Sequence, residues 1–103
     1  MKNPKGVSFD ELLARQLKDK EIRFGFEKRR FYLQVARLVA DLRTQSGLTQ
    51  AQLAKAAKVS QPLIARLERG DQQRTPTLDT VFKILKALGY RLEISAHRES
   101  RAA

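Results

Sequence analysis

Apolar residues recur at helical spacing along most of the chain. From Phe31 onward they follow the steps i, i+4, i+7, i+8 and i+11, which describe one buried face of an α-helix. This pattern predicts a long helix over Glu21–Gln45, ended by Ser46 and Gly47. Gly25 weakens a helix by about 1 kcal/mol relative to alanine, so we consider a helix start or a bend at this position.

Two shorter helices are predicted nearer the ends of the chain. Ser8 and Glu11 have the spacing of a capping box and open an amphipathic helix over Phe9–Lys18. Its apolar positions are Phe9, Leu12, Leu13 and Leu17. Thr77 caps the other helix and Gly89 ends it. The buried stripe expected of this second helix consists of Leu78, Val81, Phe82, Leu85 and Leu88.

After Gly89 the pattern changes to alternation of apolar and polar residues. A period of two is typical of a half-buried β-strand, so we predict one strand over Tyr90–Ser95. One strand cannot satisfy its own hydrogen bonds, and the simplest partner is the same strand of a second copy. The dimer contacts would then be Tyr90, Leu92 and Ile94. The alternative is a strand edge packed on its own domain.

Between these elements, the stretch TQAQLAKAAKVSQPLIARLERG predicts two short helices joined by a tight turn. Thr49 and Gln52 form a capping box that opens the first helix. Ser60 caps the second helix, with Pro62 in the first turn, and Gly70 ends it. Two short capped helices with such a turn form a helix-turn-helix.

This stretch resembles the helix-turn-helix of the XRE family, the Cro/C1-type phage repressors, and the resemblance continues through residues 37–47 and 75–89. It implies an all-α, lambda-repressor-like domain of five helices, here with an N-terminal extension helix and one C-terminal β-strand. The family usually has glycine in the turn where this chain has Lys58. A left-handed backbone at Lys58 would cost about 1 kcal/mol.

Composition narrows the choice of partner. The 103 residues include 21 Lys and Arg against 11 Asp and Glu, a formal net charge of +10 that favours a polyanionic partner. The alternative is that the charge serves solubility only. The chain has no cysteine, which excludes disulfides and thiolate metal sites, and we expect no cofactor. It also has no apolar run near the roughly 18 residues of a membrane span, so we expect a cytoplasmic protein.

The second helix of a helix-turn-helix enters the major groove of DNA with its N-terminal residues facing the bases. Here that helix is Gln61–Arg69, and Gln61 could pair with adenine while Arg66 could chelate guanine. Pro62 and Ala65 could touch a thymine methyl. The expected DNA-binding residues on this helix and its cap are Ser60, Gln61, Pro62, Ala65, Arg66 and Arg69. We expect all but the cap to be exposed, and the alternative is an ordinary solvated helix face.

The resemblance also implies roles outside this helix. Gln50 starts the first helix of the motif, where a phosphate is favoured, and is implied to contact the DNA backbone. Arg74, in the following loop, is implied to do the same. Arg43 and Glu68 are implied to form a structural ion pair between two helices.

Enzymatic function has little support in the sequence. The one histidine, His97, lies in a polar tail without a nearby nucleophile. A basic ribonuclease working with only Arg, Lys and Tyr is the competing class, and the intact helix-turn-helix argues against it.

The order of the elements looks like that of a HigA-type antitoxin. That likeness implies a protein that represses its own operon and neutralises a RelE-like ribonuclease toxin. The N-terminal stripe of Phe9, Leu12, Leu13 and Leu17 is the expected toxin contact, unless it covers its own domain. The alternatives are a stand-alone repressor and an interaction module that no longer binds DNA.

We accordingly divide the chain into three parts. Residues 1–20 are a tail and an amphipathic helix for partner binding, and residues 21–89 are the DNA-binding domain. Residues 90–103 are the strand and tail for dimerisation. The expected partners are operator DNA, a toxin and a second copy of the chain.

Overall fold

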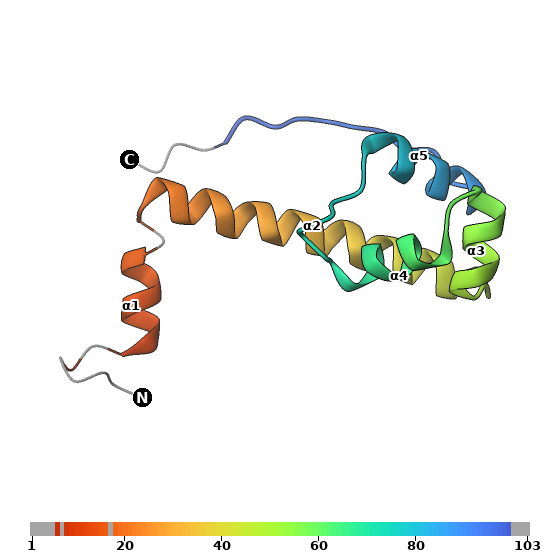
Figure 1. The fold of residues 1–103 in the computed structure, drawn as a ribbon. Helices are drawn as coiled ribbons and strands as arrows, with labels where there is room; N and C mark the ends of the chain where they lie inside the picture. Colours follow the sequence, from red (N-terminus) through yellow and green to blue (C-terminus); the bar gives the residue numbers. More distant parts are fainter. Residues whose placement is uncertain (1–5, 7, 17, 100–103) are drawn as a thin grey trace.

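The computed structural model describes residues 6, 8–16 and 18–99, which form five α-helices (Figure 1). The helices are α1 (Phe9–Gln16), α2 (Lys20–Gln45), α3 (Gln50–Ala57), α4 (Gln61–Arg69) and α5 (Leu78–Ala87). The all-helical class that the resemblance implies is therefore confirmed, and the five helices include the N-terminal extension helix. The first helix ends at Gln16, before the expected Lys18.

Helix α2 runs unbroken for 26 residues. It begins one residue before the expected Glu21, because Oδ1 of Asp19 accepts the N–H groups of Glu21 and Ile22 at 2.8 and 3.2 Å. Gly25 lies inside the helix, so the start or bend considered there is absent. Every residue from Lys20 to Phe31 is exposed, and Figure 1 shows this half of α2 projecting beyond α3, α4 and α5.

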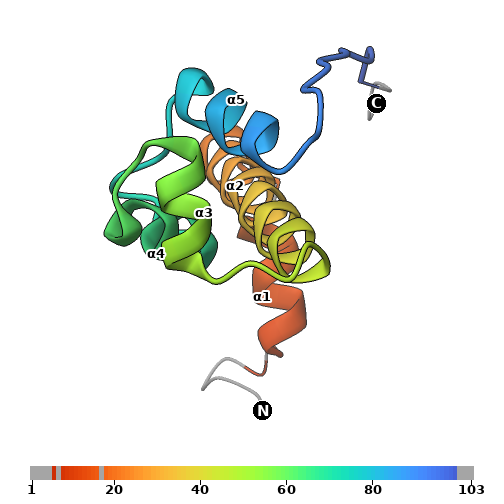
Figure 2. The same cartoon turned by 90° about the vertical axis from the view of Figure 1, so that its right-hand side faces the viewer.

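The core lies at the other end of the molecule. Helices α3, α4 and α5 gather around the C-terminal half of α2 (Figure 2). Their buried side chains form one cluster, consisting of Val39, Leu53, Ala54, Ala57, Ile64, Leu67 and Ile84. The end of α4 approaches α2 closely, since a Cβ at Gly70 would lie 2.6 Å from Cδ2 of Leu33. Gly70 also has φ +71°, so the backbone conformation favours glycine there, and a larger residue would also displace the Leu33 side chain.

Helix α5 buries a different face from the one expected. Ile84 is fully buried and Leu85 nearly so, whereas Leu78 and Phe82 are 70% and 48% exposed. The expected stripe omitted Ile84. Helix α5 has apolar residues on more than one side, but the other helices cover only one side. Their position therefore decides which apolar residues of α5 are buried.

The strand expected over Tyr90–Ser95 is not observed, since none of the described residues forms a β-strand. The segment after Gly89 is irregular, and Arg91 and Glu93 form an exposed ion pair between side chains two residues apart. A β-ladder needs the N–H and C=O groups of a neighbouring strand. The described part of the chain offers no such neighbour, so the prediction is wrong for a single copy.

The described molecule is elongated. Its radius of gyration is 17.9 Å and its extents are 54 × 32 × 23 Å, whereas a compact domain of this length has a radius near 13 Å. Helix α1 lies across the free end of α2, away from the core (Figure 1). None of the described helices combines the length and the apolar character needed to cross a lipid bilayer.

Candidate nucleic-acid interface

Local hydrogen bonds fix where α3 and α4 begin. Oγ1 of Thr49 accepts the Gln52 N–H at 3.0 Å, and Oε1 of Gln52 accepts the Thr49 N–H at 2.9 Å. This completes the predicted capping box. Oγ of Ser60 accepts the Leu63 N–H at 3.2 Å, and Pro62 lies in the first turn of α4. Both helices of the motif therefore start where the sequence predicts.

The turn between the two helices contains a left-handed residue. Lys58 has φ 58° and ψ 42°, and it is the one non-glycine residue with positive φ in the described part of the chain. Its N–H group bonds back to Lys55, and the N–H of Val59 bonds to Ala54 at 3.0 Å. These bonds end α3 and reverse the chain, in the conformation that glycine adopts most easily.

Helix α4 is anchored on one side and open on the other. Ile64 and Leu67 are buried in the core, whereas Gln61, Pro62 and Arg69 are exposed. The expectation of full exposure is wrong for Ala65 and Arg66, which are both half-buried. The open surface of α4 is therefore narrower than predicted and lies at its two ends.

The remaining candidates for DNA contact surround α4. Ser60 is exposed, but its hydroxyl is engaged in the helix cap. Arg74 is exposed in the loop between α4 and α5. It lines a cavity of about 170 Å³ together with Arg66. The structure thus brings Arg66 and Arg74 together, although the sequence places them on different elements.

Arg43 and Glu68 form a bidentate ion pair behind the motif. Nε and Nη2 of Arg43 donate to the two carboxylate oxygens of Glu68 at 2.7 and 2.9 Å. Nη1 donates to the Leu48 carbonyl at 2.8 Å. Gln50, which is expected to contact the DNA backbone, is half-buried. Its Nε2 donates a hydrogen bond to Oε1 of Glu68 at 3.1 Å. These four residues join α2, α3 and α4.

The ionisation of Glu68 follows from this network. Burial of its carboxyl group raises the pKa, but hydrogen bonds from Arg43 and Gln50 and the positive charge of Arg43 lower it by more. The pKa of Glu68 therefore lies below its ordinary value. The carboxylate is charged at neutral pH, as the ion pair requires.

A second surface lies at the N-terminal end of the molecule. None of the described residues of α1 is buried: Phe9 is 68% and Leu12 39% exposed, and Leu13 is half-buried. Leu17, the fourth member of the predicted stripe, lies outside the described residues. The first half of α2 adds four exposed apolar side chains, namely Ile22, Phe24, Phe26 and Phe31.

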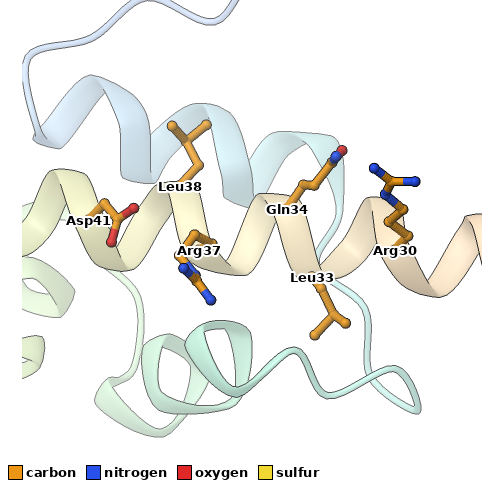
Figure 3. A pocket seen from close by; sticks show the side chains of 6 residues that line it. All are labelled: Arg30, Leu33, Gln34, Arg37, Leu38 and Asp41. Carbon is orange, nitrogen blue, oxygen red and sulfur yellow. The ribbon is translucent and has the colours of Figure 1, made fainter.

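The outer face of α2 carries charged side chains between apolar ones. Figure 3 shows Leu33 and Arg37 pointing toward α4, and Gln34 and Leu38 pointing to the opposite side. These residues line a shallow hollow of about 430 Å³. All six residues that line the hollow are exposed, so this part of α2 is open to solvent.

The predicted dimer contacts lie beside α2 and α5. Tyr90 and Ile94 are exposed, and Leu92 is half-buried. Residues 90–93 line a surface hollow of about 530 Å³ together with Leu38, Leu42 and Leu85. The C-terminal segment and the apolar side chains of α2 thus line the same hollow.

Several of these features were missed by reasoning from the sequence. The bond from Gln50 to Glu68 links residues eighteen positions apart, and the bond from Arg43 to the Leu48 carbonyl involves no side-chain pattern. The described residues contain no cluster of three or more His, Asp or Glu able to hold a metal.

This geometry defines a helix-turn-helix protein, with one capped helix held so that its N-terminal end faces outward. A family model described as helix-turn-helix, HTH_3, matches residues 39–94. Over 103 residues the chain is 36% identical to an uncharacterized HTH-type transcriptional regulator of Haemophilus influenzae, covering 97% of this chain and 96% of the relative. The chain belongs to the XRE-type helix-turn-helix family of DNA-binding regulators, which is not an enzyme family.

A solved structure gives a further likeness. It is described as a toxin-antitoxin module from Streptococcus pneumoniae, and one of its chains superimposes with a TM-score of 0.54 at 32% identity. The match covers 89% of this chain and 96% of that chain. The likeness therefore extends beyond the residues that the family model matches.

Proposed function

We propose that this protein is a sequence-specific repressor that reads operator DNA with the N-terminal end of α4. The observation that carries the proposal is the exposure of Gln61 and Pro62 directly after the Ser60 cap, on a helix anchored by Ile64 and Leu67. Family membership and the net charge of +10 support it. Gln61 can then pair with adenine in the major groove.

The proposed repressor is a homodimer. Tyr90, Leu92 and Ile94 would supply the contacts between two copies around a two-fold axis, beside the hollow on α2 and α5. A two-fold axis would place two α4 helices about 34 Å apart, which is one turn of DNA.

The test of DNA reading uses three glutamine variants. A duplex selected from a random pool by the wild-type protein is compared with a scrambled duplex of the same composition, by gel-shift titration. Gln61→Ala should lose about 1–3 kcal/mol on the selected duplex only, because it removes a base contact. Gln50→Ala should weaken both duplexes alike, and Gln34→Ala, on the outer face of α2, should change neither. Equal affinity of the wild-type protein for both duplexes would refute sequence-specific binding.

We further propose that the protein is a HigA-type antitoxin that neutralises a RelE-like ribonuclease toxin. The likeness to a chain of a toxin-antitoxin module supports this proposal. So does the exposed apolar surface of α1 and the first half of α2, which lies away from α4 (Figure 1). One chain could then bind DNA and toxin simultaneously, through separate surfaces. The alternative is a stand-alone XRE-type regulator without a toxin partner.

Deletion of residues 1–20 tests the antitoxin proposal. The shortened protein should lose toxin affinity by at least about tenfold, as expected when buried apolar contacts of an interface are removed. Its operator affinity and melting temperature should stay close to those of the full chain, because no described residue of α1 is buried. Isothermal titration calorimetry with the product of the neighbouring gene measures the loss. If the full chain does not bind that product, the stand-alone regulator is favoured.

A further inference from the structure

Arg66 differs from the other basic residues of α4 and its loop. Arg69 and Arg74 are exposed, whereas Arg66 is half-buried. Its Nε is buried and has no hydrogen-bond partner among the described residues, and it is the one such side-chain atom in that part of the chain. An unpaired buried N–H group is costly, and on a guanidinium it also carries positive charge. This Nε atom therefore lacks the acceptor that a buried guanidinium N–H group normally has.

The cavity beside Arg66 is lined by basic, polar and apolar residues and by no carboxylate. The cavity of about 170 Å³ is lined by Leu63, Arg66, Leu67, Arg74, Thr75, Pro76, Thr77 and Thr80. This set holds two arginines, three threonines and no acidic residue. A cavity of this volume has room for about five water molecules, and hence for a tetrahedral phosphate group.

The nearest acidic residues in the sequence are engaged elsewhere. Glu68 accepts hydrogen bonds from Arg43 and Gln50. Asp71 accepts the Gln73 N–H at 3.0 Å. Both carboxylates have other partners, and no described residue accepts a hydrogen bond from the Nε of Arg66. A ligand bound in the cavity could supply an acceptor to the guanidinium group of Arg66.

The start of α5 adds to the positive potential of the cavity. Thr77 caps this helix of ten residues, with its Oγ1 accepting the Thr80 N–H at 3.1 Å. The N-terminal end of a helix favours anions through its free N–H groups and its dipole. Two arginines at the same place add the donor geometry that matches phosphate oxygens.

We propose that Arg66 binds a phosphate in this cavity together with Arg74, and that it does not read a base. This inference rests on the proposed DNA-binding function and assigns Arg66 the role of a positioning residue within it. Contacts to phosphates fix the orientation of a protein on DNA, whereas contacts to base edges carry the sequence information. Base reading then falls to the exposed residues of α4, with Gln61 first among them.

The experiment compares Arg66→Gln and Arg66→Lys with the base-reading variant Gln61→Ala. Arg30→Gln serves as a charge-matched control, because Arg30 is exposed on α2 and points to the side opposite α4 (Figure 3). Dissociation constants are measured at several salt concentrations on the selected duplex and on its scrambled counterpart. A thermal melt of each variant shows whether it folds.

Arg66→Gln should weaken binding to both duplexes by the same factor, on the order of tenfold, and reduce the slope of log K against log salt by about 1. Arg66→Lys should recover most of the affinity and the slope, because it keeps the charge. A loss confined to the selected duplex, a changed base preference or an unchanged salt slope would overturn the proposal. If Arg66→Gln does not fold, Arg66→Lys decides: an unchanged base preference with most of the affinity and salt slope retained supports the proposal, and a changed base preference contradicts it.

A second arm separates two sources of phosphate. Melting of the free protein is followed in inorganic phosphate and in chloride at equal ionic strength. A rise in melting temperature in phosphate that Arg66→Gln abolishes would show that the cavity also accepts free phosphate. If the melting temperature does not rise in phosphate, and Arg66→Gln weakens binding to both duplexes equally, the cavity binds only the phosphates of a DNA backbone. If the wild-type protein did not prefer its selected duplex, the proposed function would fail, whereas a changed base preference in Arg66 variants would contradict this inference alone.

Discussion

At the scale of single residues, Lys58 shows a local conflict between sequence and backbone. Its positive φ suits glycine, and an L-residue pays about 1–2 kcal/mol there. Lys58→Gly should therefore raise the free energy of unfolding by about 1 kcal/mol, or the melting temperature by about 4–8 °C. Lys58→Ala is the control, since it removes the amine but keeps the Cβ. A lower melting temperature for the glycine variant would mean that the lysine side chain stabilises the turn.

The Arg43–Glu68 pair allows a comparison of two ion pairs in one molecule. The side chains of Arg43 and Glu68 are 15% and 7% exposed, whereas those of Lys83 and Asp79, 3.1 Å apart on α5, are 51% and 70% exposed. A double-mutant cycle on the first pair should give a coupling energy well above about 0.5 kcal/mol. The exposed pair should give about 0.5 kcal/mol or less, because water screens it. Additive effects at Arg43 and Glu68 would contradict the expected coupling.

The same pair predicts a dependence of stability on pH. The pKa of Glu68 is lower in the folded chain than in the unfolded one, so folding favours the charged form. The carboxylate of Glu68 makes its full contribution to the free energy of unfolding above the unfolded-state pKa of about 4.3. This contribution is lost as the pH falls through the lower pKa of the folded state. Urea denaturation of wild type and Glu68→Gln should therefore differ at pH 7 and converge in acid. A constant difference down to pH 3 would rule out this linkage.

At the scale of elements, the segment after α5 carries the proposed dimer contacts. A truncation after Gly89 removes Tyr90, Leu92 and Ile94 but none of the buried core residues. It should sediment as a folded monomer at concentrations where the full chain is a dimer, because it lacks these contacts. A truncated protein that remains a dimer would place the interface elsewhere, with the exposed face of α2 as the next candidate.

At the scale of the whole molecule, stability is concentrated at one end. Leu53 is fully buried between helices, and Leu53→Ala should cost about 2–5 kcal/mol of unfolding free energy. Phe24 is 66% exposed on the projecting half of α2, and Phe24→Ser should change stability by about 0.5 kcal/mol or less. Chemical denaturation measures both. A large loss at Phe24 would show that the free half of α2 is packed in solution, for example in the dimer.

The sequence by itself determined the local structure of this protein. The caps at Thr49, Ser60 and Thr77 and the left-handed turn at Lys58 involve atoms only a few residues apart, so the sequence contains all of their causes. The same local pattern carried the resemblance to the XRE family, which the comparisons confirm.

Only the tertiary structure decided which apolar and polar groups are covered. Periodicity marks Phe31 and Phe82 as apolar stripe positions, yet both are exposed, because burial depends on where the other helices dock. Alternation at residues 90–95 favours a strand, yet a strand requires a neighbour that lies outside the described single copy. The burial of Arg66 beside Arg74, and the bond from Gln50 to Glu68, likewise depend on the packing of α4 between α2, α3 and the loop before α5.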